Sequence, residues 1–184
     1  MPTPKPKALI ISTNYGTETD ELIKSIEGLR AANIDVTVAG VETTPIRTLI
    51  LDAEPGPTVE VDTTLQDVDP GSYDALVIPG GTLNADALRI NEHAQDIARS
   101  FASAGKLIAS VCHGPWLLVE TKLAAERTLT SYHSVRTDIV NAGGTWLDEA
   151  VVKDTTNGFP LITSRTPFDM DAFVPAIVDN LSSK

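Results

Sequence analysis

The sequence predicts an α/β fold of three layers, in which a mostly parallel sheet lies between two layers of helices. Short apolar runs typical of buried strands alternate with amphipathic stretches typical of helices along the whole chain. The first segments follow a strand–helix–strand order, which favours parallel pairing. The strongest apolar runs end at polar or glycine-containing loops, where open sheets of this kind form their sites.

The N-terminal third contains the elements that are easiest to assign. We predict a strand over residues 8–11, a helix over about residues 19–32 and a second strand around Val36, Val38 and Val41. The pattern is weaker over the next segment, where we expect two short strands and a turn. The strands are predicted at residues 49–51 and 59–61, and the turn at residues 54–57.

The rest of the chain continues the alternation and ends in a helix. Gly105 and the pair Gly143-Gly144 are typical stops after helices. Segments 13–18, 79–81 and 112–116 each follow a predicted strand, so we expect them to share one rim of the sheet. The predicted strands lie at residues 75–78, 107–111, 151–152 and 161–163, and the predicted helices at about residues 91–104, 117–119, 135–142 and 167–181.

Length and composition indicate a single domain over residues 1–184, with residues 1–6 flexible. The formal net charge of −11 disfavours phosphate backbones and anionic membrane surfaces, so we expect neither nucleic acid nor membrane as a partner. No signal peptide and no apolar run of membrane-spanning length is recognisable, and a single cysteine cannot form an internal disulfide. We therefore expect a cytoplasmic protein.

Cys112, that single cysteine, lies where a predicted strand ends and a helix begins at Pro115. Free backbone N–H groups at a helix start favour negative charge, so a reactive thiolate of lowered pKa is expected. The alternative is a buried structural cysteine. His113 either moves protons at the site or only bonds the turn. The three histidines are widely spaced, so no metal site is expected.

Two further features can contribute to the site only if they lie at the same rim of the sheet as Cys112. Gly80 and Gly81 form either an oxyanion-binding loop or an ordinary turn after a strand. Glu18 is either a solvated charge at a helix start or a carboxyl that acts on the sulfur. No glycine-rich dinucleotide or nucleoside triphosphate motif is recognisable.

These segments resemble the PfpI family of the class I glutamine amidotransferase-like superfamily. Residues 111–118 resemble its nucleophile elbow, residues 16–22 its first loop with the active-site glutamate, and residues 74–81 its oxyanion loop. Residues 129–132, 141–143 and 162–165 also fit, so the resemblance covers nearly the whole chain. It implies a flavodoxin-like sheet, no cofactor and a homodimer or a larger ring of dimers.

Position by position, the resemblance implies roles for individual residues. Cys112 would be the nucleophile, His113 its partner and Glu18 the acid that hydrogen-bonds the sulfur. Asp86 matches an acid that family members take from a neighbouring subunit. The substrate and the oxyanion would be bound by Gly80, Gly81, Gly114, Trp116 and Tyr132, whereas the role of His133 stays open.

Two classes of function follow. As an enzyme, the protein would attack small carbonyls such as methylglyoxal, or their adducts, through Cys112 and release lactate; the same site could hydrolyse amide or peptide bonds. As a redox-sensing stress protein, it would instead use oxidation of Cys112 to switch partner binding or a chaperone-like activity. A glutamine amidotransferase is less well supported, because the three histidines lie at or before position 133.

Overall fold

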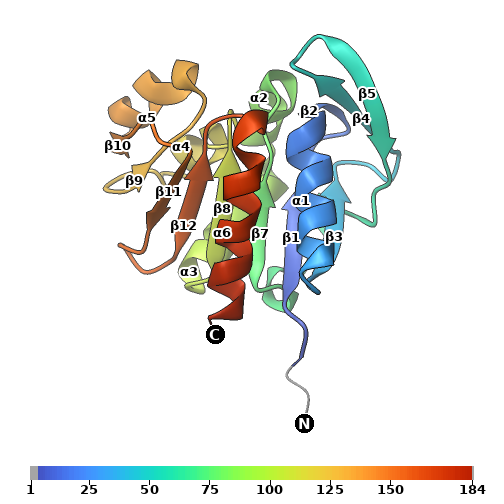
Figure 1. Ribbon diagram of the computed structural model, residues 1–184, viewed down its shortest axis with the longest axis horizontal. Coiled ribbons are helices and arrows are strands. Elements are labelled where there is room, and N and C mark those ends of the chain that lie inside the picture. The colour runs from blue at the N-terminus through green and yellow to red at the C-terminus, as the bar shows by residue number, and fades with distance from the viewer. Residues whose placement is uncertain (1–3, 184) are drawn as a thin grey trace.

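A seven-stranded sheet forms the centre of the molecule in this computed structural model, which describes residues 4–183 (Figure 1). The strand order is β11-β12-β8-β7-β1-β3-β6. Neighbouring strands run parallel, except for the antiparallel pair β11–β12 at one edge. The bounds are β1 (Lys7–Ile11), β3 (Asp35–Gly40), β6 (Thr63–Thr64), β7 (Ala75–Ile78), β8 (Leu107–Val111), β11 (Val151–Asp154) and β12 (Leu161–Ser164).

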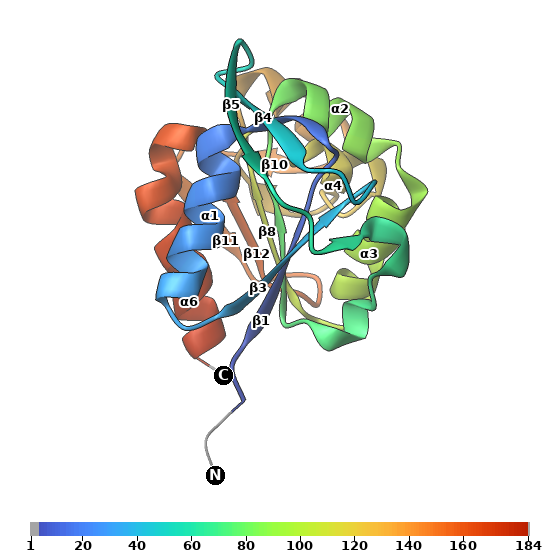
Figure 2. The same cartoon turned by 90° about the vertical axis from the view of Figure 1, so that its right-hand side faces the viewer.

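Helices cover both faces of this sheet, as Figure 2 shows. Successive residues of β1 point to opposite faces, so that Ala8 and Ile10 belong to one core cluster and Leu9 and Ile11 to the other. The three-layer α/β/α class is thereby confirmed. Helices α1 (Thr19–Ala31) and α6 (Met170–Ser182) lie on the first face; α2 (Thr82–Arg89), α3 (Glu92–Ser103), α4 (Trp116–Glu120) and α5 (Arg136–Asn141) lie on the second.

Two small sheets and four short 3-10 helices complete the described chain. A three-stranded sheet joins β2 (Tyr15–Glu18), β4 (Ile46–Ile50) and β5 (Glu54–Val59), and the β4–β5 hairpin stands above the carboxyl ends of the central strands (Figures 1 and 2). The other elements are β9 (Thr128–Leu129), β10 (Thr145–Trp146), η1 (Leu65–Asp67), η2 (Pro70–Ser72), η3 (His133–Val135) and η4 (Pro167–Asp169).

The hairpin differs from its prediction. The turn lies at residues 51–53, whereas residues 54–57, which were expected to form it, belong to β5. Pro55 and Pro57 are compatible with a strand here because β5 is an edge strand, where a missing N–H leaves no ladder bond unmade. Proline and glycine therefore marked an edge strand rather than a turn.

Smaller differences occur elsewhere. Helix α2 was not predicted, and Val41 lies beyond β3 and is exposed. Of the segment expected to be flexible, residues 1–3 lie outside the described residues, while the carbonyl of Pro6 accepts a hydrogen bond from Asp35 N–H (2.9 Å). None of the helices within residues 4–183 combines the length and the apolar character of a membrane-spanning segment.

The three loops expected to share one rim of the sheet do so. A Cβ atom on Gly81 would lie 2.1 Å from the carbonyl oxygen of Gly16, and one on Gly80 would lie 2.9 Å from Cβ of Cys112. Such distances are far below van der Waals contact, so only glycine lets these backbones approach. Close packing of the loops after β1, β7 and β8 creates the site described next.

Candidate active site

Cys112 forms a strained turn between β8 and α4. Its φ of 62° lies in the left-handed region, which is costly for a residue with a side chain. Two neighbouring segments hold its backbone: Cys112 N–H donates to the Ser164 carbonyl (3.1 Å), and the Cys112 carbonyl accepts from Tyr132 N–H (2.8 Å). The side chain is only 6% exposed. The elbow therefore presents the sulfur in one fixed, nearly enclosed position.

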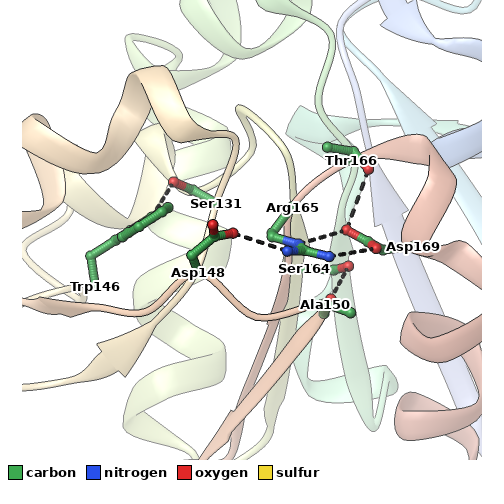
Figure 3. Close-up of polar contacts among 8 residues, drawn as sticks. All are labelled: Ser131, Trp146, Asp148, Ala150, Ser164, Arg165, Thr166 and Asp169. Carbon is green, nitrogen blue, oxygen red and sulfur yellow. Dashed lines mark hydrogen bonds and ion pairs between the residues drawn. The ribbon is translucent and has the colours of Figure 1, made fainter.

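A polar network behind the elbow fixes those two segments (Figure 3). Ser164 Oγ donates to the Ala150 carbonyl (2.6 Å), and the next residue, Arg165, pairs with Asp148 (2.9 Å) and Asp169 (3.0 Å). Ser131, which precedes Tyr132, accepts a hydrogen bond from Trp146 Nε1 (3.0 Å). These contacts support the backbone acceptor and donor that hold Cys112.

Glu21, and not Glu18, lies against the sulfur. Glu21 is fully buried in the first turns of α1, where Oε2 accepts a hydrogen bond from Gly80 N–H (2.6 Å) and the carboxyl contacts the Cys112 thiol. Glu18 is the residue before α1, and its Oε2 instead accepts from Leu51 N–H (2.8 Å) at the hairpin tip. One helical turn separates the two acids, and only the later one points inward. The resemblance was therefore carried to the wrong glutamate.

Burial dominates the electrostatics of Glu21 and Cys112. It raises the pKa of Glu21 to about 8, against the opposing hydrogen bond from Gly80. Burial, followed by the charge of Glu21, raises the pKa of the Cys112 thiol. Two negative charges in contact are unfavourable, so the pair holds one at most, and near neutrality Glu21 is protonated. A protonated Glu21 can donate a hydrogen bond to the sulfur when a thiolate forms.

The expected lowering of the thiol pKa comes only from the backbone N–H of His113, and burial and the charge of Glu21 outweigh it. Helix α4 has only five residues, so its dipole is small. The resting sulfur is a thiol, and its activation needs a base.

His113 is placed to be that base. Its Nδ1 lies 3.3 Å from Sγ of Cys112, and its Nε2 lies 3.5 Å from Thr82 Oγ1 and 3.4 Å from Ser134 Oγ. Burial lowers the pKa of His113, so the ring is neutral near pH 7 and can accept a proton. The sequence left open whether His113 reaches the sulfur, and the geometry shows that it does.

Aromatic rings fix the orientation of this imidazole. Tyr132 stacks on it with centroids 4.9 Å apart, and Trp116 meets it edge-on at 5.1 Å. Trp116 is itself held by a hydrogen bond from Nε1 to Asp138 (2.8 Å), and the His133 ring lies tilted against Tyr132 with centroids 4.3 Å apart. Trp116 and Tyr132 therefore contact the imidazole, whatever further contact they make with a substrate.

The backbone N–H groups around the sulfur divide into two kinds. Those of Gly80 and Gly114 are already bonded, to Glu21 (2.6 Å) and to the Val111 carbonyl (2.9 Å). In the described chain, Gly81 N–H has no acceptor, and His113 N–H faces only the sulfur. Two N–H groups thus remain available, those of Gly81 and His113, and binding of an oxyanion by Gly80, Gly81 and Gly114 stays a prediction.

Asp86 is separate from this constellation within one chain. It is exposed on α2, one turn beyond Thr82, and within residues 4–183 no hydrogen bond or ion pair joins it to Cys112 or His113. Its service to a neighbouring subunit stays a prediction. Thr82, Ser134 and Glu21 were not predicted as site residues. For Glu21 the sequence does contain an indication of burial, since it is next to Leu22 in the apolar stripe of α1 and one turn before the buried Ser25.

Comparisons with known proteins show the family of this chain. The DJ-1/PfpI family model matches residues 6–180. The chain is 36% identical over 172 residues to a protein named Deglycase PfpI from Pyrococcus furiosus, covering 94% of this chain and 97% of that one. It is 38% identical over 118 residues to the Putative cysteine protease YraA of Bacillus subtilis, covering 64% and 67%.

A solved structure extends the likeness to three dimensions. DJ-1beta of Drosophila melanogaster superposes with a TM-score of 0.87 at 33% identity, over 98% of this chain and 92% of that one. The fold, the elbow and the match over nearly the whole length lead to one conclusion: this chain belongs to the DJ-1/PfpI family.

Proposed function

We propose that this protein is a cofactor-independent, cysteine-dependent enzyme that converts small reactive carbonyls such as methylglyoxal, in protection against carbonyl stress. The observation that carries the proposal is the position of the neutral His113 imidazole, whose Nδ1 lies 3.3 Å from Sγ of Cys112. Burial raises the pKa of this thiol, so the thiol needs a base to ionise. The name deglycase, given to the Pyrococcus relative, supports the same substrate class.

The reaction begins with transfer of the Cys112 proton to Nδ1 of His113. The thiolate forms a bond to the aldehyde carbon, and the carbonyl electron pair becomes an oxyanion that Gly81 and His113 N–H groups bind. Glu21 donates its proton to this oxyanion, which gives a hemithioacetal and leaves Glu21 as a carboxylate. Glu21, which moves between its acid and its carboxylate form near pH 8, then carries the proton from the former aldehyde carbon toward the adjacent carbon. The product is a lactoyl thioester, which water cleaves to lactate and free thiol.

Enclosure of the site favours a small carbonyl over a peptide. Cys112 and His113 are each 6% exposed, so a peptide bond within a folded chain cannot approach the sulfur without displacing the rim. Hydrolysis of amide or peptide bonds, which the name of the Bacillus relative suggests, is the second activity to measure.

The direct test compares wild type with Cys112→Ser on methylglyoxal and on a fluorogenic peptide. We expect lactate from methylglyoxal that depends on Cys112, and little peptide cleavage. Asp171→Asn, at an exposed position of α6, is the matched control and should behave as wild type. Lactate formation equal in wild type and Cys112→Ser would refute the proposal, and peptide cleavage alone would replace it with an amidase.

Oxidation of Cys112 as a switch is the alternative from a different class. Low exposure and a raised thiol pKa both disfavour rapid oxidation, because thiolate is the form that peroxide attacks. We therefore expect Cys112 to resist peroxide at doses that oxidise a free thiol, as measured by mass spectrometry. Sulfinic acid formed at low doses would instead favour the switch.

We also propose that two copies of the chain assemble. An apolar groove of about 930 Å³ borders α2 and includes Tyr15, Leu83 and Ile90, which are 45%, 50% and 71% exposed. Asp86 lies on the same helix, so a second copy seated in this groove would lie next to it. Light scattering should report a dimer, and Leu83→Asp should shift it toward monomer. A wild-type monomer at micromolar concentration would reject this assembly.

A further inference from the structure

The tip of the β4–β5 hairpin is a strained turn held over the active-site rim. Leu51 and Asp52 have φ values of 50° and 58°, in the left-handed region that glycine or asparagine usually fills in such turns. Two side-chain contacts hold the tip. Glu18 Oε2 accepts from Leu51 N–H (2.8 Å), and both carboxylate oxygens of Asp52 bind Thr82. This conformation aims Asp52 at the start of α2.

The contact with Thr82 is bidentate. Asp52 Oδ1 accepts from Thr82 N–H (2.8 Å), and Oδ2 lies 2.6 Å from Thr82 Oγ1. A carboxylate only accepts hydrogen bonds, so the Thr82 hydroxyl must donate its single proton to Asp52. The lone pairs of Thr82 Oγ1 are then directed at other donors, and Nε2 of His113 lies 3.5 Å away.

This direction of bonding selects one form of the imidazole. With its proton committed to Asp52, Thr82 can only accept from Nε2–H of His113, and Ser134 Oγ, 3.4 Å from Nε2, can accept from the same N–H. The proton of the neutral ring then resides on Nε2, and Nδ1 faces Sγ of Cys112 (3.3 Å) with its lone pair free. This is the tautomer that can take the thiol proton. The 3.5 Å contact is long, as such contacts often are before substrate binds.

We propose that Asp52 is a positioning residue of the active site, which acts through the Thr82 hydroxyl to hold His113 in the form that deprotonates Cys112. The inference deepens the proposed function and rests on its assignment of Cys112 and His113. It gives the histidine an acid from its own chain, independent of Asp86 and of any second subunit.

The charges around His113 are consistent with this role. Burial and the nearby His133 lower the pKa of His113, whereas the charge of Asp52 raises it. The remaining titratable groups around the ring are Cys112 and Tyr132, with Glu21 behind the thiol. Asp52 therefore favours the imidazolium that exists after the thiol proton has moved.

The experiment follows alkylation of Cys112 by iodoacetamide as a function of pH, which needs no carbonyl substrate. Asp52→Asn should slow alkylation near neutrality roughly ten-fold and shift the pH profile upward by about one unit. This is the effect expected if loss of the Asp52 charge lowers the pKa of the His113 imidazolium by about one unit. Thr82→Val should do the same, whereas Thr82→Ser, which keeps the hydroxyl, should restore the wild-type profile. Glu54→Gln, an exposed acid beside the tip, controls for surface charge.

Each outcome separates the two proposals. Wild-type pH profiles for both Asp52→Asn and Thr82→Val would overturn the positioning role. A slower rate with an unshifted profile in Thr82→Val, unrescued by Thr82→Ser, would reduce Thr82 to a structural residue and also overturn it. A shifted profile in a protein that forms no lactate would sustain the positioning role and reject the carbonyl chemistry instead.

Discussion

The elbow at Cys112 and the tip of the β4–β5 hairpin both place residues with side chains in the left-handed region, at φ 62° for Cys112 and at 50° and 58° for Leu51 and Asp52. The elbow is buried, and backbone groups of Ser164 and Tyr132 hold it. The tip is exposed, and side chains alone tie it to the rim. Strain at the elbow is therefore maintained by the core, whereas strain at the tip depends on a few polar contacts that can be removed one at a time.

The largest loss of stability and activity should come from a change next to the buried elbow. In Gly80→Ala, the new methyl would lie 2.7 Å from Glu21 Oε2 and 2.9 Å from Cys112 Cβ. We expect a loss of about 1–3 kcal/mol in the free energy of unfolding from overpacking. Lactate formation should fall about 100-fold, because the sulfur is displaced.

Gly71→Ala is the control for that substitution. It lies in an exposed turn, where the nearest atom to the new methyl is an aspartate side-chain oxygen at 3.1 Å. Its stability and activity should stay close to wild type. Equal activity in Gly80→Ala and wild type would mean that the elbow is not held by close packing.

The second largest effect should come from Glu21, as a pH dependence of stability. Folding raises its pKa from 4.5 to about 8, so the folded state binds more protons between these values, and stability falls as the pH rises through that window. Glu21→Gln should flatten this slope, a change of roughly a few kcal/mol in the free energy of unfolding across the window. Denaturant unfolding at several pH values measures it, and parallel curves for the two proteins would contradict the buried, protonated carboxyl.

A smaller gain is expected at the exposed tip. Leu51→Asn places a residue that tolerates positive φ at an exposed position and should raise the free energy of unfolding by about 1 kcal/mol or less. The same exchange at Leu147, which is exposed without a positive φ, should bring no gain. Equal thermal shifts in the two variants would show that loss of an exposed apolar side chain, and not relief of strain, is responsible.

The smallest effect should be that of Glu18→Gln. Glutamine keeps an oxygen that can accept from Leu51 N–H, so we expect a loss of about 0.5 kcal/mol or less in stability. Its rate of lactate formation should fall far less than that of Glu21→Gln, measured side by side. The reverse order would restore Glu18 as the acid that acts on the sulfur.

The three-layer fold and the shared rim follow from the order of the apolar runs along the chain. Apolar runs at β1, β7 and β8 could only be buried between helices, and parallel strands bring the loops that follow them to one edge. Cys112 and His113 were recognisable for the same reason, because they directly follow such a run. Prediction was weakest for residues 43–69, where short edge strands rich in proline and glycine carry little periodic signal.

Which groups meet at the sulfur depends on how distant segments of the chain pack together. Glu18 and Glu21 differ by one helical turn, and although Glu21 borders the apolar stripe of α1, its contact with the sulfur forms only when α1 is docked on the sheet. The path from Asp52 through Thr82 to His113 joins residues 30 and 31 positions apart. The raised thiol pKa likewise follows from burial, which depends on how the loops pack, and not from local order along the chain.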